Sequence, residues 1–288
     1  MLSVPLFGII FALLAALSSG FEKLLRKKIA INVDPLTFAF FFELIAAIFA
    51  FPLFVINFNL PEAGYLWLLV LLSGFLWAGV AFTMAKSYKH LDASFIAPVS
   101  RLRVILVLIF SIIFLNETLN FNKIAGTLLT FGGLVFLSYK KGANFSKFKE
   151  EGMIYLILSI LFASSVFIVD KFAVNFFNTS TYTFMIYFTA SIILSPWVFS
   201  KRKDVEHIIK SKFILLVILV SLLSVLYYYS LLSAFKFAEA SVILPITEFS
   251  SLVAVLGGIF FLNERTDMKK KIISIIIIIA GIIIVGLS

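Results

Sequence analysis

Ten apolar stretches, each close to the length of a membrane-crossing helix, are the feature that most constrains this chain. They cover residues 4–21, 35–56, 65–85, 93–115, 121–139, 152–169, 181–200, 213–235, 240–262 and 272–287. An α-helix needs about 20 residues to cross the hydrocarbon core of a bilayer. Backbone groups in lipid must satisfy their own hydrogen bonds, so these stretches fold as helices. The sequence therefore predicts an all-α integral membrane protein with ten transmembrane helices.

The composition excludes a water-soluble fold. Hydrophobic residues make up 62% of the chain and charged residues 14%, whereas about a quarter of a soluble domain is charged. The net charge of +9 comes from basic residues in short loops beside the apolar stretches, so we expect anionic lipid headgroups rather than nucleic acid as their partners. The chain has no Cys and two isolated His residues. We therefore expect no metal, no cofactor and no enzyme activity.

The chain repeats itself at an offset of 147 residues. The tetrapeptide FLNE occurs at 114–117 and again at 261–264, and HLDASFIAPVSRLR (90–103) lies over FAEASVILPITEFS (237–250). Each copy holds five apolar stretches, and an odd number of crossings turns the second copy upside down in the membrane. The sequence therefore predicts two inverted five-helix repeats, an arrangement typical of secondary transporters.

The basic residues follow the predicted inversion. The odd-numbered connections between apolar stretches carry 19 of the 24 Lys and Arg residues. The even-numbered connections carry 3, counting Lys123 at the start of the fifth stretch with the connection before it. The basic side of a membrane protein faces the cytoplasm, so we expect a plasma-membrane protein with both termini outside the cytoplasm. Equivalent connections of the two halves, 1–144 and 145–288, differ in basic content, as inversion requires.

The repeated FLNE ends the fourth apolar stretch of each half and leads into the fifth. Asn is favoured at helix caps, and a carboxylate is stabilised near the positive N-terminal end of a helix. We therefore interpret Glu117 and Glu264 as parts of a turn and cap at the membrane interface. A gating or substrate role is the alternative.

Four ionisable residues lie deep inside the apolar stretches, away from their ends: Glu43, Arg101, Arg103 and Glu248. Each costs at least about 2.5–3.5 kcal/mol at the bilayer centre, so such residues are functional candidates. Arg101 and Glu248 are repeat equivalents, and inverted symmetry would place both near the midplane. They could bind the carboxylate and amine of a zwitterion, or Glu248 could carry a coupling proton; a structural salt bridge is the alternative. Arg103 points about 200° away from Arg101 on an unbroken helix, so we expect Arg103 to form a structural ion pair with Glu43.

Two prolines at repeat-related positions point to the same region. Pro98 and Pro245 each remove a helical hydrogen bond and free the carbonyl of Ser94 or Ser241, four residues earlier. Broken helices at such positions predict a binding site, although packing alone also tolerates them. Further cavity candidates are Trp77, Thr83, Tyr227, Tyr228, Ser18, Ser19, Ser164 and Ser165. Interface anchoring by the aromatic residues and helix packing by the serines are the alternatives.

A pattern A-S-x-x-x-P opens the fourth apolar stretch of each half, and L-N-E closes it. In this duplicated pattern the chain resembles the EamA-type family of the drug/metabolite transporter superfamily, over essentially its whole length. The resemblance implies a ten-helix secondary transporter, usually an exporter of amino acids, metabolites or drugs. It also implies a central cavity lined by stretches 1, 3, 4, 6, 8 and 9, with stretches 5 and 10 at the periphery. Many relatives carry Arg in the second stretch, where this chain has Glu43.

The predicted function is export of amino acids or similar small polar metabolites by alternating access, with the proton as the candidate coupling ion. A multidrug exporter with a looser aromatic cavity and a flippase for a lipid-linked substrate are the alternatives. We expect a monomer, or a weak homodimer that uses the fifth and tenth stretches.

Overall fold

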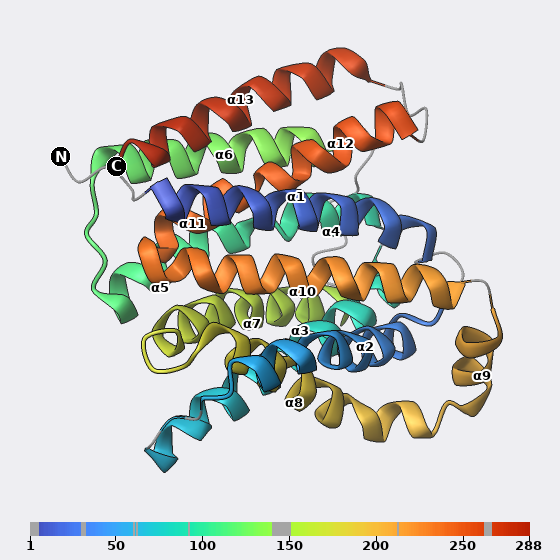
Figure 1. The fold of residues 1–288 in the computed structure, drawn as a ribbon. Helices are drawn as coiled ribbons and strands as arrows, with labels where there is room; N and C mark the ends of the chain where they lie inside the picture. Colours follow the sequence, from blue (N-terminus) through green and yellow to red (C-terminus); the bar gives the residue numbers. More distant parts are fainter. Residues whose placement is uncertain are drawn as a thin grey trace.

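The computed structural model describes residues 6–29, 33–59, 61, 63–91, 93–139, 151–211, 213–261 and 267–288, with their side chains except those of 27, 28, 93, 94 and 261. The regular elements of these residues are all helices (Figure 1). The first half contains α1 (Leu6–Ile29), α2 (Pro35–Ile56), the 3-10 helix η1 (Gly64–Leu66), α3 (Trp67–His90), α4 (Ala93–Val99), α5 (Leu102–Leu115) and α6 (Phe121–Ser138). The second half contains α7 (Glu151–Ala173), α8 (Thr179–Phe199), α9 (Arg202–Lys210), α10 (Phe213–Phe237), α11 (Ala240–Thr247), α12 (Phe249–Phe261) and α13 (Met268–Gly286).

Within these residues, nine helical segments are long and apolar enough to cross a membrane. They correspond to the first nine predicted crossings, with α4–α5 and α11–α12 each acting as one segment. The tenth prediction falls on α13, which is 19 residues long but carries three lysines in its first turn. The chain is therefore an all-α, multi-pass membrane protein.

Two of the predicted helices are divided. The fourth apolar stretch forms α4 and α5, and the ninth forms α11 and α12. Each division follows a proline, Pro98 in α4 and Pro245 in α11. The two divisions lie at equivalent places in the two halves. Each half of the sequence therefore specifies the same helix break.

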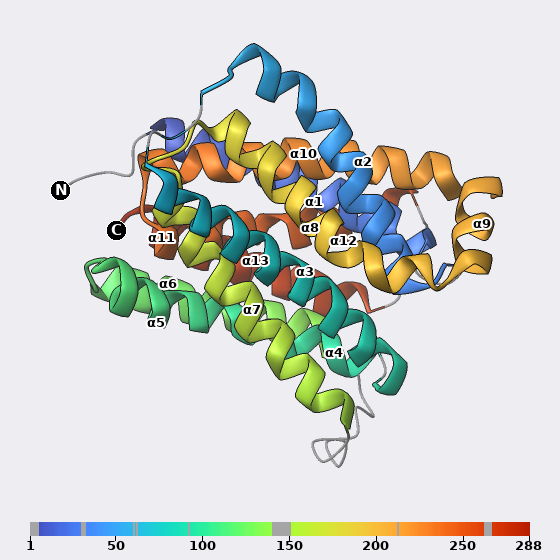
Figure 2. The same ribbon diagram turned by 90° about the horizontal axis from the view of Figure 1, so that it is seen from below.

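Other helices continue past the charges that end an apolar stretch in the sequence. α1 extends through Glu22 and Arg26, which form an ion pair one helical turn apart, with 2.7 Å between Arg26 Nε and Glu22 Oε1. α7 likewise runs through Asp170. The predicted loop at 201–212 contains the short helix α9, which lies at one end of the bundle (Figures 1 and 2). Apolar character alone therefore placed these helix ends too early.

Most large contacts between two helices have a counterpart in which each helix is replaced by its equivalent from the other half. α1 packs on α10 as α7 packs on α3, and α1 packs on α12 as α7 packs on α5. α3 packs on α8 as α10 packs on α2, while α2–α8 and α6–α13 are their own counterparts. The start of α1 and the end of α13 lie at the same end of the bundle (Figures 1 and 2).

The fifth and tenth predicted helices, α6 and α13, lie side by side along one edge (Figure 1). Their contact depends on glycine, because a Cβ atom on Gly281 would lie 2.6 Å from the backbone nitrogen of Thr130 and 2.7 Å from the carbonyl oxygen of Gly126. Small residues allow this close approach of helix backbones. Gly126 and Gly281 thus make this close contact within the chain.

Candidate functional site

The candidate site is built at the two helix breaks. At the first, the amide of Arg101 donates to the carbonyl of Pro98 at 3.2 Å, and at the second the amide of Glu248 donates to the carbonyl of Pro245, also at 3.2 Å. Hydrogen bonds three residues apart continue from Val104 to Arg101 and from Ser251 to Glu248. These bonds tighten the backbone locally. Arg101 and Glu248 therefore occupy the same position in two nearly identical turns.

Three side chains meet between these breaks. Arg101 Nη1 lies 3.2 Å from Glu248 Oε2, and Arg103 Nη2 lies 2.6 Å from Glu248 Oε1. Lys23 of α1 approaches from the side, where its Nζ donates to Ser250 Oγ at 2.6 Å. Two guanidinium groups thus bind one carboxylate, and the charge of the nearby Lys23 acts on the same carboxylate, so the group carries an excess of positive charge.

The predicted pair between Arg103 and Glu43 is wrong, because Arg103 binds Glu248. The prediction assumed one continuous helix through Arg101 and Arg103. Arg101 instead lies in the break before α5, so the regular rotation of a helix does not relate the directions of the two side chains. Glu43 is buried in α2, and the charged residues that act on it are Arg26 and Glu22 of α1.

A small cavity lies beside Glu248. α5, α7, α10 and α11 line it, and its polar lining comes from Arg103, Tyr227, Thr247 and Glu248. The centre of a water molecule has about 10 Å³ to occupy there, which is close to the least that one bound water requires. The predicted cavity residue Tyr227 therefore lies at the cavity, and the space is nearly closed.

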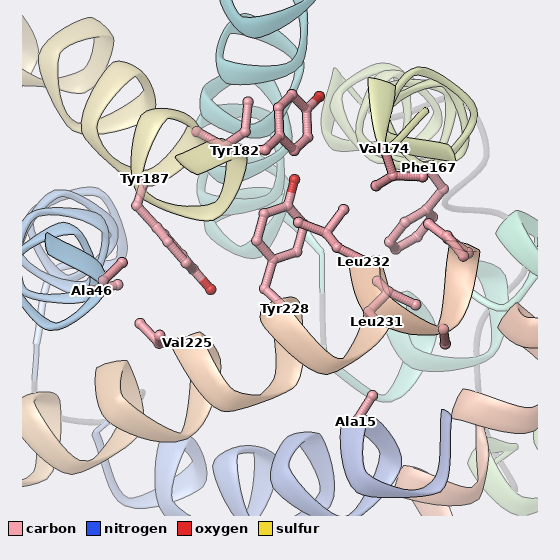
Figure 3. Packing of buried hydrophobic residues seen from close by; sticks show 14 of the residues in the cluster. Ala15, Ala46, Phe167, Val174, Tyr182, Tyr187, Val225, Tyr228, Leu231 and Leu232 are labelled. Carbon is pink, nitrogen blue, oxygen red and sulfur yellow. The ribbon is translucent and has the colours of Figure 1, made fainter. Parts of the chain in front are cut away.

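A second buried polar group lies around Asp170 of α7, which has 0% of its surface exposed. Its Oδ1 accepts hydrogen bonds from Ser73 Oγ at 2.5 Å and Tyr182 OH at 2.9 Å, and its Oδ2 accepts one from Tyr228 OH at 2.7 Å. Trp77 Nε1 donates to the Tyr228 hydroxyl at 3.3 Å. Tyr228 projects from α10 toward Tyr182 in the buried core (Figure 3). The predicted candidates Trp77 and Tyr228 are thus brought together by a carboxylate that the prediction did not include.

The remaining predicted candidates are less informative. Thr83 Oγ1 donates to the carbonyl of Gly79 at 2.6 Å and Ser164 Oγ to that of Ile160 at 2.8 Å, both within their own helices. Ser19 is buried, whereas Ser18 and Ser165 are half-buried. Ser241 is buried and its hydroxyl has no hydrogen-bond partner. The side chain of Ser94 and all of Glu264 lie outside the described part of the chain.

Glu117 caps a helix, but the helix belongs to the other half. Its carboxylate accepts the backbone amides of Ala240 at 2.6 Å and Ser241 at 3.0 Å, at the start of α11. Lys123 joins the same region by an ion pair with Glu239. The first FLNE motif therefore ties the two halves together at one end of the bundle.

Asp34 plays a similar part before α2. Its Oδ2 accepts the amide of Thr37 at 3.0 Å, and its Oδ1 lies 2.7 Å from Lys201 Nζ. Burial alone would raise the pKa of the Asp34 carboxyl, but the hydrogen bonds from Lys201 and Thr37 outweigh it, and the pKa lies below its usual value. Asp34 is therefore held in its charged form.

Sequence reasoning missed Lys23 and Asp170 because both lie where an apolar stretch appears to end. A signal for them was present. The first helix of each half reads SSGFEK (18–23) or SSVFIVDK (164–171), so each carries a serine pair followed by an acidic residue and a lysine. At the 147-residue offset that relates Arg101 to Glu248, Lys23 lies over Asp170, so the repeat also marks these two positions.

Comparisons with known proteins agree with this architecture. The model of the EamA-like transporter family matches the chain twice, over residues 6–139 and 150–287. No curated protein sequence matches the chain. One solved structure with a similar fold, described only as the crystal structure of a protein, is 14% identical, covers 96% of this chain and 95% of its own, and superposes with a TM-score of 0.78. At that identity the likeness concerns the fold alone. The two family matches together span nearly the whole chain, and the chain therefore belongs to the EamA-like transporter family.

Proposed function

We propose that this chain is a secondary transporter of the plasma membrane that exports amino acids or similar small polar metabolites by alternating access. In this proposal ten transmembrane helices form two inverted repeats, and one repeat rocks against the other around the group formed by Arg101, Arg103, Lys23 and Glu248. Both termini face away from the cytoplasm.

The observation that carries the proposal is the ion pair between Arg101 and Glu248 at equivalent helix breaks. Buried ionisable residues are costly in a membrane protein, and they mark substrate or ion pathways. Discontinuous helices that meet at the interface of two repeats are typical of transporter binding sites. The paired helix contacts between the halves support the same two-repeat arrangement.

The chemistry of the site suits a zwitterion. The carboxylate of an amino acid can replace Glu248 on one or both guanidinium groups, since planar guanidinium binds carboxylate with two parallel hydrogen bonds. The released Glu248 carboxylate can then bind the substrate ammonium. The excess of positive charge in this group disfavours a cationic drug, so we place the multidrug reading second.

The test compares the metabolites inside and outside cells that express the wild type, Glu248→Gln or Arg101→Ala at equal membrane abundance. We expect a class of small polar metabolites to accumulate outside wild-type cells, and both variants to lower its export at least about tenfold, which corresponds to about 1.4 kcal/mol. Glu206→Gln is the matched control, because Glu206 forms an exposed ion pair with Lys210 on α9, away from the site.

Three other outcomes would count against the proposal. If no soluble compound differs between wild-type and empty cells, metabolite export is wrong, and lipid extracts then test the flippase reading. If wild-type cells gain only resistance to toxic cations, the multidrug reading replaces ours. If export is unchanged in both variants, the Arg101–Glu248 pair is a structural salt bridge. Arg101→Lys, which keeps the charge, serves if Arg101→Ala fails to reach the membrane.

A further inference from the structure

We propose that Asp170 is a reversible proton-binding site, and that its protonation state controls the hydrogen bonds that join α3, α8 and α10 to α7. The proposal assigns the coupling proton of the proposed transport function to Asp170 rather than to Glu248. The role of this proton in transport rests on the proposed function, but proton binding itself can be tested without a substrate.

The partners of Asp170 distinguish it from three other buried carboxylates. Glu248 binds two guanidinium groups, Glu22 binds Arg26, and Glu117 binds two backbone amides. Within the described residues, Asp170 binds three neutral hydroxyl groups. Protonation of Glu248 would leave two cations unpaired in the protein interior, which is costly. Protonation of Asp170 leaves no unpaired charge.

The hydroxyl partners can follow a change in protonation. A charged carboxylate only accepts hydrogen bonds, and it accepts three here, whereas a protonated one must donate a hydrogen bond. One of the hydroxyls of Ser73, Tyr182 and Tyr228 must then turn from donor to acceptor, which a hydroxyl can do. Hydrogen bonds to a charged group are also stronger than those to a neutral group. Protonation therefore loosens α3, from the first half, against three helices of the second half.

The other polar groups near Asp170 have partners of their own. On α10, Tyr227 lines the cavity beside Glu248. On α5, Arg103 binds Glu248, and on α7 the ammonium of Lys171 donates to the carbonyls of Phe235 and Ala238. Trp77 of α3 donates to the Tyr228 hydroxyl. Among the described residues, then, no cationic side chain pairs with Asp170, and a proton can neutralise it without displacing its hydroxyl partners.

Asp170 also lies in a suitable place along α7. Phe167, one turn deeper, lines the cavity beside Glu248, and α7 ends three residues after Asp170, at Ala173. The connection that follows is one of the lysine-poor connections, which are predicted to face outward. A proton from outside would thus meet Asp170 before the central group, an order that suits the exchange of a proton for an exported substrate.

The test uses Trp77 as the reporter. The chain has 3 Trp, so replacing Trp67 and Trp197 by Phe leaves Trp77 alone, joined to Asp170 through Tyr228. The full-length protein in lipid nanodiscs is titrated with protons from about pH 5 to about pH 9, a range that reaches strongly shifted carboxyl groups. We expect the emission of Trp77 to change in one step as the pH is varied. The step should be absent in Asp170→Asn and present at a different midpoint pH in Asp170→Glu.

Glu43→Gln is the control, since it removes another buried carboxylate and should leave the step in place. A flat titration of the parent protein would overturn the proposal, as would a step that persists in Asp170→Asn. If Asp170→Asn does not fold, Tyr182→Phe takes its place, because it leaves the connection from Trp77 through Tyr228 to Asp170 intact. It keeps the carboxylate but removes one of its donors, and an unchanged midpoint would then contradict the proposal. If the export assay fails, the result of the Trp77 titration is unaffected. If export is observed but Trp77 emission does not titrate, only this inference is overturned.

Discussion

Single buried charges in this chain are stabilised by different kinds of partner. Glu248 is held by opposite charges, Asp170 by hydroxyl groups, and Glu117 by the backbone amides at the start of α11. The kind of partner decides what each residue can do. An ion pair can exchange partners with a charged substrate, a carboxylate among hydroxyls can take a proton, and a cap holds a helix end in place.

Asp34 gives a test of stability at this scale. Asp34→Asn keeps a good N-cap for α2 but loses the ion pair with Lys201, whereas Asp34→Ala loses both. Loss of an N-cap costs about 1 kcal/mol, so we expect Ala to be less stable than Asn by roughly that amount. Thermal unfolding of the purified variants in detergent at neutral pH measures the difference.

The pH dependence of Asp34 follows from its lowered pKa. The charged carboxylate stabilises the folded state above the usual Asp pKa of about 4. That stabilisation is lost as the pH falls through the lower pKa of the folded protein. The advantage of the wild type over Asp34→Asn should therefore be full at pH 7 and vanish in acid. An advantage that stays constant into acid would show that the ion pair does not contribute.

At the scale of helices, the sequence predicted which helices exist better than it predicted where each helix ends. The spans came from hydrophobic length, which is a local property, and nine of them agree with helices of the structure. The breaks could be expected from Pro98 and Pro245, but the direction of Arg103 could not, because it depends on where the regular helix stops. The partner of Glu117 could not be predicted either, since it lies 123 residues away in the chain.

Two glycines of the last helix pair make a matched experiment on packing. A Cβ on Gly281 would meet the backbone of α6 at 2.6 Å, whereas a Cβ on Gly132 would have nothing within 4 Å. We expect Gly281→Ala to destabilise the protein by about 1–3 kcal/mol through overpacking. Gly132→Ala should be neutral or stabilising by up to about 1 kcal/mol, because Ala favours a helix. Equal thermal stability of the two variants would mean that α6 and α13 do not pack this closely.

The orientation of the whole molecule can be mapped because the chain has no Cys. Single cysteines at Lys210 on α9 and at Leu119 between α5 and α6, both exposed, should react with a membrane-impermeant maleimide from opposite sides. Position 210 lies in the lysine-rich connection 201–212 and should react from the cytoplasm, and position 119 should react from outside. Labelling of both positions from the same side would contradict the predicted topology.

The ion pair at the centre also has a consequence for how the protein is made. Arg101 and its partner Glu248 are 147 residues apart, so at about 5–20 residues per second the ribosome adds the second roughly 7–30 s after the first. During that interval Arg101 and Arg103 have left the ribosome without the carboxylate that neutralises them in the finished fold. The insertion machinery has to keep both guanidinium groups away from hydrocarbon until the second half arrives. A ribosome that stalls between the halves therefore leaves a fragment whose fourth segment lacks its counter-charge.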